Sequence, residues 1–191
     1  MDRDVRPLED VVLPGLVAGV LSTLTLGACA RLIGKRPSAP VSAVSHWVWP
    51  QEVNQTARPR ARHLLTGLAI HHLMSVGWAA VNAFTLAAIQ ENVRPCRSSR
   101  SEHSQRFALA TALTIVAAFS DYVVVPKRFT PGFEFHLKVP HIASVYVAFG
   151  AGLVAPFVVE DFCKIRRLAP SSDHPTATRS LGPIESRLQE R

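Results

Sequence analysis

Residues 64–90 read LLTGLAIHHLMSVGWAAVNAFTLAAIQ, and this stretch decides the fold. Its only titratable side chains are those of two adjacent histidines, His71 and His72. An α-helix rises about 1.5 Å per residue, so roughly 20 apolar residues cross the hydrocarbon core of a bilayer. A helix on the surface of a soluble protein would instead carry polar residues along its outer face. The stretch therefore predicts a membrane-spanning helix.

Three further windows have the same length and character. Val11–Ala30 and Ile142–Val159 carry no charge, and Phe107–Pro126 carries only Asp121. The sequence therefore predicts an all-α bundle of four transmembrane helices joined by short loops. The predicted spans lie at about 11–32, 63–90, 107–125 and 141–162.

The predicted membrane domain covers residues 11–163, between an N-terminal tail (1–10) and a basic tail (164–191). The second tail is rich in Ser, Thr and Pro, a composition typical of disorder. Four spans place both termini on the same side of the membrane. Lys and Arg are divided evenly between the two sides, so the positive-inside rule leaves the orientation open.

The net charge of +7 and the pI of about 10.0 do not indicate nucleic-acid binding, because no nucleic-acid-binding motif accompanies the charge. The basic residues flank the spans, where they meet lipid headgroups, so the lipid bilayer is the predicted partner. The odd set of three cysteines, Cys29, Cys96 and Cys163, has no disulfide or metal-site spacing and predicts inert thiols.

The segment LGACA at 26–30 is similar to a signal-peptide cleavage site. The residues before it include Asp2, Asp4, Glu9 and Asp10, so the segment lacks the positive beginning of a signal peptide. We therefore expect a retained helix.

Polar side chains form a stripe on the second span. His71, Ser75, Trp78 and Asn82 are separated by 4, 3 and 4 residues, which is one face of a helix, while His72 points about 100° away. A polar stripe in a membrane helix should face other helices rather than lipid. We therefore expect it to point into the bundle.

Depth adds a second constraint. His71 lies roughly 10 Å into the second span, and Asp121 lies roughly 7–8 Å before the end of the third span on the same side. Tyr122 is adjacent to Asp121, and His141 begins the fourth span there. These residues predict a polar layer in one half of the bilayer, with a direct contact between Asp121 and His71 as our hypothesis.

Three interpretations of this layer remain open. It could fix the helix register as a structural network, serve a proton-coupled or small-solute transporter, or supply histidines to haem in an electron carrier. No nucleophile elbow or zinc motif is present, so we predict no catalytic residue, no metal and no cofactor. The leading prediction is a small integral membrane protein with a structural or accessory role.

Small residues predict where helices pack. Gly15 and Gly19 lie four apart in the first span, and Gly150 and Gly152 offer a similar face on the fourth. Such spacing lets helix backbones approach closely. These faces predict helix packing and could support a homo-oligomer.

Loop residues complete the pattern. Trp47 and Trp49 are expected at the bilayer surface, together with Phe129, Phe133 and Phe135 around a turn at Pro131-Gly132.

HWVWP at 46–50, LAIHHLMSVGWA at 68–79, SDYVVVPKRFTPGFEFHL at 120–137 and VYVAFGAGL at 145–153 carry a resemblance. Over roughly residues 12–155 the chain resembles an uncharacterised group of small four-span bacterial inner-membrane proteins. The resemblance implies a multi-pass protein of the plasma (inner) membrane and no particular activity. It directs attention to the following residues: His71, His72, Asp121, Lys127, Arg128 and Glu134.

Overall fold

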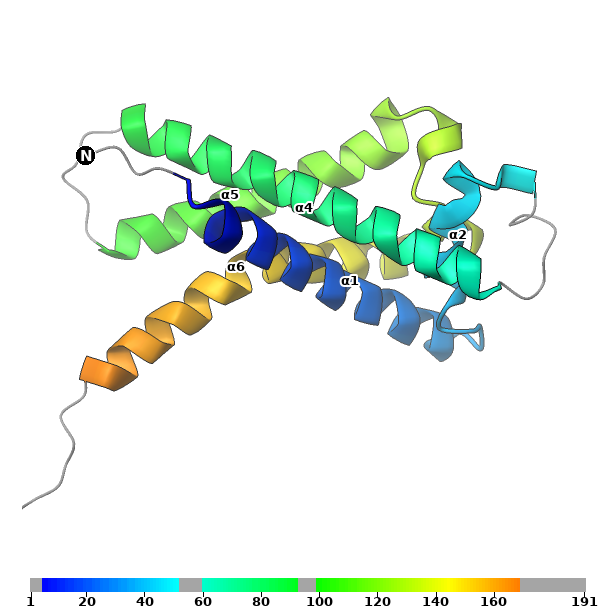
Figure 1. Ribbon diagram of the computed structural model, residues 1–191, viewed down its shortest axis with the longest axis horizontal. Coiled ribbons are helices and arrows are strands. Elements are labelled where there is room, and N and C mark those ends of the chain that lie inside the picture. Colours follow the sequence, from blue (N-terminus) through cyan, green and yellow to red (C-terminus); the bar gives the residue numbers. More distant parts are fainter. Residues whose placement is uncertain (1–4, 52–59, 93–98, 169–191) are drawn as a thin grey trace, which may run out of the picture.

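The computed structural model describes residues 5–51, 60–92 and 99–168 of the chain. The structure is 87% helical, and the described residues contain no strand. Four of the helices are long and apolar enough to cross a membrane (Figure 1). The predicted all-α bundle of four spans is confirmed.

The spans lie where the sequence places them, but the helices are longer. Their bounds are Pro7–Leu32, Ala61–Asn92, His103–Val124 and Val139–Lys164. The first is η1 (Pro7–Val12) continued by α1 (Leu13–Leu32), and the second is α4 (Ala61–Asn92). The third is α5 (Ser99–Phe119) continued by η3 (Ser120–Val124), and the fourth is α6 (Val139–Leu168).

Both predicted tails contain helical residues next to the membrane domain. The first helix begins at Pro7, within the predicted N-terminal tail, because proline suits a first helical position and Glu9 and Asp10 favour the first turn. The last helix continues to Leu168, so residues 164–168 are helical. The rest of the predicted disordered tail lies outside the described residues.

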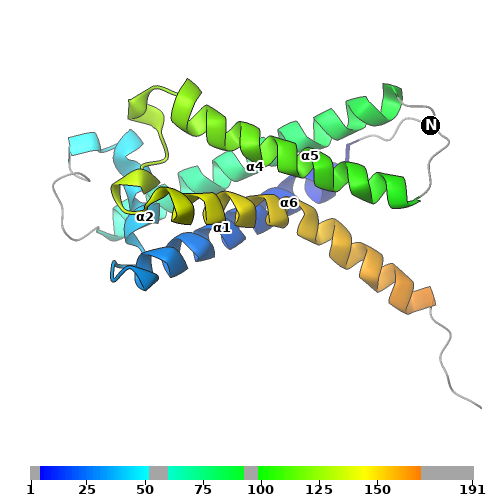
Figure 2. The same cartoon turned by 180° about the vertical axis from the view of Figure 1, so that it is seen from behind.

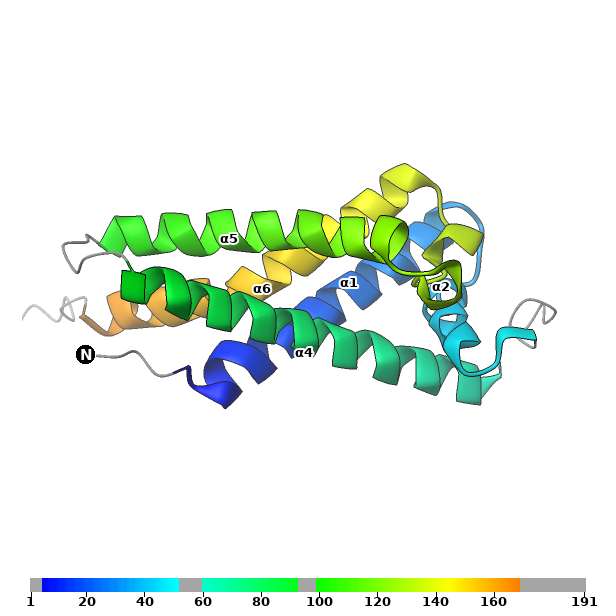
Figure 3. The same ribbon diagram turned by 90° about the horizontal axis from the view of Figure 1, so that it is seen from above.

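The helices of the bundle pack on one another to different extents. α1 packs most extensively on α6 and next on α4, while α5 packs mainly on α6 (Figure 3). α4 and α5 have less contact than any of these pairs, so the bundle is loosest between them. α6 bends midway, as expected for a helix with Pro156 inside it (Figure 2). Helix ends near Pro7 and Leu168 lie at one end of the bundle, here called the terminal end, and the opposite end is called the loop end.

The outer surface of the bundle is apolar. Leu73, Ile115 and Val147 expose 72%, 64% and 69% of their surface, each on a different helix. A soluble protein rarely exposes large apolar side chains over so much of its surface. The chain is therefore an integral, multi-pass membrane protein whose outer face is suited to lipid.

The four predicted packing glycines all lie against other helices of the same chain. A Cβ atom at Gly15 would meet Val76, and one at Gly19 would meet His72, both on α4. A Cβ atom at Gly150 would meet Thr114 of α5, and one at Gly152 would meet Ala18 of α1. These faces are thus buried within one chain, and a homo-oligomer, which stays a prediction, would have to use another surface.

At the loop end, a short helical segment folds into the bundle instead of lying on the bilayer surface. It consists of α2 (Ala39–Ala43) and η2 (Val44–Trp47), and residues 40–46 are buried. The segment rests on α4 at Gly67, where the absence of a side chain makes room for the Val41 carbonyl. Trp47 is only partly exposed and donates from Nε1 to the Thr130 carbonyl at 3.0 Å.

The second loop at this end contains η4 (Lys127–Phe129) and η5 (Phe133–Phe135). Gly132 has a φ of 78°, as a turn at this position requires. Phe129 and Phe135 are exposed, but Phe133 is only 3% exposed and belongs to the core, which corrects its predicted surface position.

The third span ends in a wide turn that positions Asp121. Pro126 disfavours a helical conformation at Val125, whose ψ is 136°. The last turn closes through a bond from the Val125 amide to the Ser120 carbonyl at 2.9 Å, five residues back. Single wide turns of this kind are frequent at functional sites.

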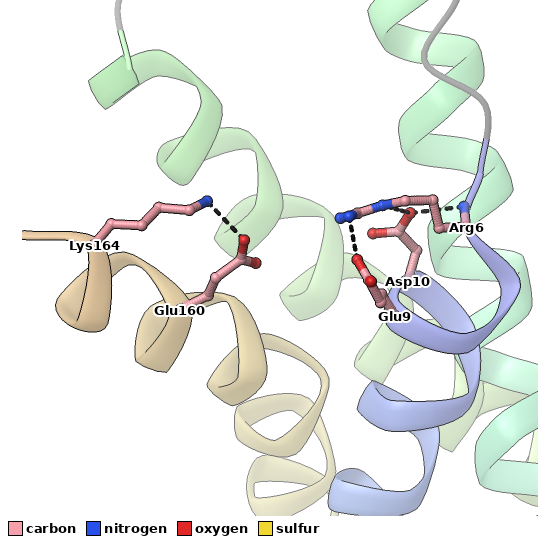
Figure 4. A network of polar contacts seen from close by, with 5 residues as sticks. All are labelled: Arg6, Glu9, Asp10, Glu160 and Lys164. Carbon is pink, nitrogen blue, oxygen red and sulfur yellow. Dashed lines mark hydrogen bonds and ion pairs between the residues drawn. The ribbon is translucent and has the colours of Figure 1, made fainter. Parts of the chain in front are cut away.

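At the terminal end, the polar contacts drawn in Figure 4 are all close in sequence. The Arg6 guanidinium pairs with Glu9, and its Nε lies 3.8 Å from Asp10 Oδ2. Lys164 Nζ pairs with Glu160 Oε1 at 2.6 Å. Exposed pairs of this kind contribute about 0–1 kcal/mol each. They fit a solvated helix end.

His136 gives the loop end a pH-dependent stability. It lies between the third and fourth spans, and burial, followed by the nearby charge of Lys35, lowers its pKa from the ordinary value of 6.5. The unfolded chain therefore binds a proton more readily than the folded chain, so stability is complete well above pH 6.5 and falls as the pH drops below it. We expect His136→Gln to lose less thermal stability than wild type between pH 7.5 and pH 5.5. Unfolding curves of both proteins at the two pH values measure this. If wild type and His136→Gln lost the same thermal stability on going from pH 7.5 to pH 5.5, this assignment would be contradicted.

Candidate binding cavity inside the bundle

A cavity of about 70 Å³ lies inside the bundle toward the loop end, and we call it the loop-side cavity. All four spans contribute to its wall, together with the two loop segments. It lies between one core cluster around Leu26 and Phe133 and another around Ala79 and Leu153. The residues that line it are Ser22, Val44, Trp47, Ile70, His71, Met74, Ser75, Trp78, Ala117, Asp121, Pro131, Phe133, Val145, Tyr146 and Phe149.

The polar wall is built from two bonds between helices. His71 Nε2 lies 2.9 Å from Ser22 Oγ, which joins α4 to α1. The Tyr146 hydroxyl donates to Asp121 Oδ2 at 2.6 Å, which joins α6 to η3. Ser75 Oγ donates to the His71 carbonyl at 2.8 Å within α4. Polar groups from four spans thus converge on one cavity.

The hypothesis of a direct bond between Asp121 and His71 is wrong. Each side chain has its own partner, Tyr146 for Asp121 and Ser22 for His71, although both line the loop-side cavity. α4 packs on α5 less extensively than the other neighbouring pairs of helices pack, and both side chains border the cavity instead of each other. Depth along the helices predicted their common level but not their partners.

Other members of the predicted layer lie around the cavity without lining it. His72 packs on Gly19 and bonds through Nδ1 to the Leu68 carbonyl at 2.9 Å. The Tyr122 ring contacts the Tyr146 ring edge-on at 6.3 Å between centroids. His141 is partly buried near the start of α6 and is not among the lining residues. The layer therefore divides into a cavity wall and a packing part.

The three loop candidates lie on the surface of the loop end. Lys127, Arg128 and Glu134 are exposed. Glu134 Oε1 accepts a bond from Thr130 Oγ1 at 2.7 Å, and the Arg128 guanidinium lies 5.7 Å from the Phe129 ring centre. These contacts shape the loop, and none of the three residues lines the cavity.

The remaining cavity wall is apolar and partly aromatic. Trp47, Trp78, Phe133 and Phe149 surround the polar groups. Each water molecule needs roughly 10–15 Å³ of cavity volume. The loop-side cavity, with about 70 Å³, therefore has room for about five water molecules or one small organic molecule.

Asp121 provides the negative charge of the site. No ion pair to its carboxylate occurs in the described part of the chain, and its bonding partner, Tyr146, is neutral. A carboxylate within a membrane is costly unless it is protonated, hydrated or paired with a cation. Asp121 is therefore a carboxyl group at the cavity that must be protonated, hydrated or paired with a bound cation.

A second, smaller cavity lies toward the terminal end. This terminal-side cavity has a volume of about 30 Å³, and Asn82 of the polar stripe lines it. Asn82 is 7% exposed, and its Oδ1 has no hydrogen-bond partner among the described residues. Gln90, one turn beyond Leu86 on the same helix, lines the same cavity, and its Nε2 also lacks a partner there.

Metal and haem ligation find little support in the geometry. No cluster of three or more His, Cys, Asp or Glu side chains that could hold a metal ion occurs among the described residues. His71 and His141, two histidines of the predicted polar layer on different spans, do not both line the loop-side cavity. A cavity of about 70 Å³ is also far too small for a porphyrin without moving the helices.

Ser22 and Tyr146 are the polar residues of the cavity wall that the sequence interpretation missed. Tyr146 lies seven residues after the start of α6, which places it roughly 10 Å deep, close to the level of Asp121. The depth argument used for His71 would therefore have found it. Ser22 offers no such signal, because a serine in a membrane helix commonly bonds to its own backbone, as this one also does with Ala18.

In comparisons with known proteins, no family model, no curated protein and no solved structure matches the chain. The resemblance to small bacterial inner-membrane proteins therefore stays a prediction.

Proposed function

We propose that this chain is an accessory protein of the bacterial plasma membrane that binds a small organic cation in the loop-side cavity. The observation that carries the proposal is the convergence of Asp121, Tyr146, His71 and Ser22, from four spans, on one cavity of about 70 Å³. A largely apolar pocket with a few convergent polar groups is the usual form of a small-molecule site.

Charge and aromatic surface favour a cation as the occupant. The Asp121 carboxylate has no cationic partner among the described residues, so a bound ammonium group would balance it. The rings of Trp47, Trp78 and Phe149 line the same cavity, and aromatic faces attract cations. A small anion would meet repulsion from Asp121.

A structural role explains only part of the arrangement. The bonds from His71 to Ser22 and from Tyr146 to Asp121 each join two neighbouring helices, as a register-fixing network would. Such a network would not require a cavity between the bonds, since well-packed apolar residues would hold the helices together as well. The cavity therefore favours ligand binding beside the structural role.

The proposal is tested with ethylammonium as the probe and acetate, which has one more non-hydrogen atom, as the probe of opposite charge. Saturation-transfer NMR on the full chain in detergent should show binding of ethylammonium only. With three non-hydrogen atoms, the dissociation constant is expected to be about 1 mM or weaker.

Two alanines of α5, each replaced by leucine, supply a test variant and its control. Ala117 is 1% exposed and lines the cavity, so Ala117→Leu should fill it and abolish binding. Ala112 lies on the exposed side of the same helix, so Ala112→Leu should bind as wild type does. Equal signals from the two probes, or binding that survives Ala117→Leu in a folded chain, would refute the proposal.

A further inference from the structure

We propose that the two cavities are the ends of one route for protons through the bundle, closed by a thin apolar layer. The inference uses the loop-side cavity of the proposed function but not its ligand. A chain that binds ethylammonium and conducts no protons would leave the binding proposal intact and overturn this one.

The two cavities follow the same helix faces. On α4, Trp78 lines the loop-side cavity and Asn82 lines the terminal-side cavity. On α6, Phe149 lines the first and Leu153 lines the second. Residues four apart share a helix face and differ by about 6 Å in height. Two separate helices therefore place the cavities one above the other, about one helical turn apart.

The layer between the cavities is apolar and tightly packed. Ala79 is 1% exposed, Leu153 is 0% exposed and Phe149 is 6% exposed, and all three belong to one core cluster with Leu113 and Ala110. An apolar constriction of this kind excludes water and blocks ions until it widens. Phe149 and Leu153 form the closure, because each borders a cavity.

Both cavities carry groups that can hold water. Titratable or hydrogen-bonding side chains of the loop-side cavity include His71, Asp121 and Tyr146. In the terminal-side cavity the unpartnered atoms Asn82 Oδ1 and Gln90 Nε2 lie beside Asp10 and Arg106. A buried amide without a protein partner is costly unless water bonds to it. Asp10, which lies beside Arg6 at the terminal end (Figure 4), lines this cavity and has a side chain that is 21% exposed, so the cavity borders the outside of the bundle there.

The size of the cavities selects the species. At roughly 10–15 Å³ per water molecule, the terminal-side cavity holds about two water molecules and the loop-side cavity about five. Two water molecules are enough to pass a proton along hydrogen bonds. A solute larger than these would not fit into the terminal-side cavity. The proton enters at one cavity and leaves at the other, so no redox partner is required.

Proton flux into liposomes that contain the purified full chain tests the route. A pH-sensitive dye is trapped inside, and a potassium gradient with valinomycin supplies the driving potential. Phe149→Ala with Leu153→Ala removes the closure and should raise the flux at least about tenfold over the control. The control is Phe162→Ala on the same helix, because Phe162 is 70% exposed to lipid.

A further substitution ties the flux to this route. Asn82→Leu removes the unpartnered amide and leaves an apolar side chain with the same number of non-hydrogen atoms, whose larger volume the adjoining cavity can accommodate. Added to the double variant, it should return the flux to the control level, whereas Asn92→Leu at the exposed end of α4 should not.

Loss of the fold is detected by circular dichroism and size-exclusion chromatography. Should the double variant fail to fold, Phe149→Leu carries the test, because it keeps a large apolar side chain and should conduct above the control. A folded closure variant with flux equal to Phe162→Ala would overturn the route. Increased flux that Asn82→Leu leaves unchanged would overturn the path assigned to it.

Discussion

Gly67→Ala is expected to destabilise the bundle by about 1–3 kcal/mol, the usual cost of overpacking a close-packed contact. A Cβ atom at this position would lie 2.1 Å from the Val41 carbonyl oxygen, which belongs to the backbone of α2 and cannot rotate away. The α2 segment would have to leave its place on α4, and with it Val44 and Trp47, which line the loop-side cavity. Thermal unfolding in detergent measures the effect.

Gly77 provides the matched control on the same helix. A Cβ atom there would meet nothing within 4 Å, so Gly77→Ala should be neutral or stabilise α4 by up to about 1 kcal/mol. Gly152→Ala should behave as Gly67→Ala does, because its Cβ atom would lie 2.4 Å from Ala18 Cα on α1. If all three variants unfolded alike, the close contacts described here would be incorrect.

Tyr146→Phe is expected to cost about 1.5–3 kcal/mol, the range for a hydrogen bond to a charged group. The substitution removes the hydroxyl that lies 2.6 Å from Asp121 Oδ2 and leaves the carboxylate without that donor inside the membrane. The ring keeps its edge-on contact with Tyr122, so the loss should come from the bond and not from packing.

A double-mutant cycle separates this bond from other effects. Asp121→Ala combined with Tyr146→Phe should cost less than the sum of the single changes, with a coupling of about 0.5–3 kcal/mol. Asp121→Ala combined with His71→Ala should be closer to additive than the first pair, because the two residues line the same cavity but share no bonding partner. Additivity in the first pair and coupling in the second would restore the contact between Asp121 and His71 that the structure excludes.

Much of the fold could be predicted because the bilayer constrains it so strongly. Charge-free windows of suitable length leave a chain few alternatives to spanning helices, since every backbone polar group must be satisfied inside the membrane. The spacing of His71, Ser75, Trp78 and Asn82 then predicted an inward-facing stripe. Three of these residues line the loop-side cavity and the fourth, Asn82, lines the terminal-side cavity.

The residues that escaped prediction depend on which helices touch. Membrane helices lack a strong hydrophobic preference for one another, so close contacts of small residues decide their neighbours. Gly152 against Ala18 brings α1 close to α6, the most extensive helix contact of the bundle, whereas α4 and α5 pack on each other much less. Asp121 consequently bonds to Tyr146 and not to His71, a choice that periodicity and depth cannot reveal.

The same limit applies to the loop end. Trp47 and Phe133 are aromatic residues, which are typical of the membrane–water interface, yet both line the cavity. They are drawn inward because Gly67 admits the α2 segment and because Gly132, with its positive φ, turns the second loop back toward His46. Two glycines thus decide a burial that the aromatic residues alone do not indicate.

We expect the polar stripe of α4 to face water in the two cavities and not lipid. The rate at which 2-aminoethyl methanethiosulfonate, a small cationic thiol reagent, modifies a cysteine at Ser75 tests it most directly. In a background without native cysteines, Ser75→Cys should react at least about tenfold faster than Leu73→Cys, because only a thiol in contact with water forms the reactive thiolate. Leu73 is the control because it is 72% exposed on the lipid-facing side of the same helix. Ethylammonium should slow the reaction of Ser75→Cys alone. Equal rates at the two positions, or faster modification at Leu73, would contradict the account.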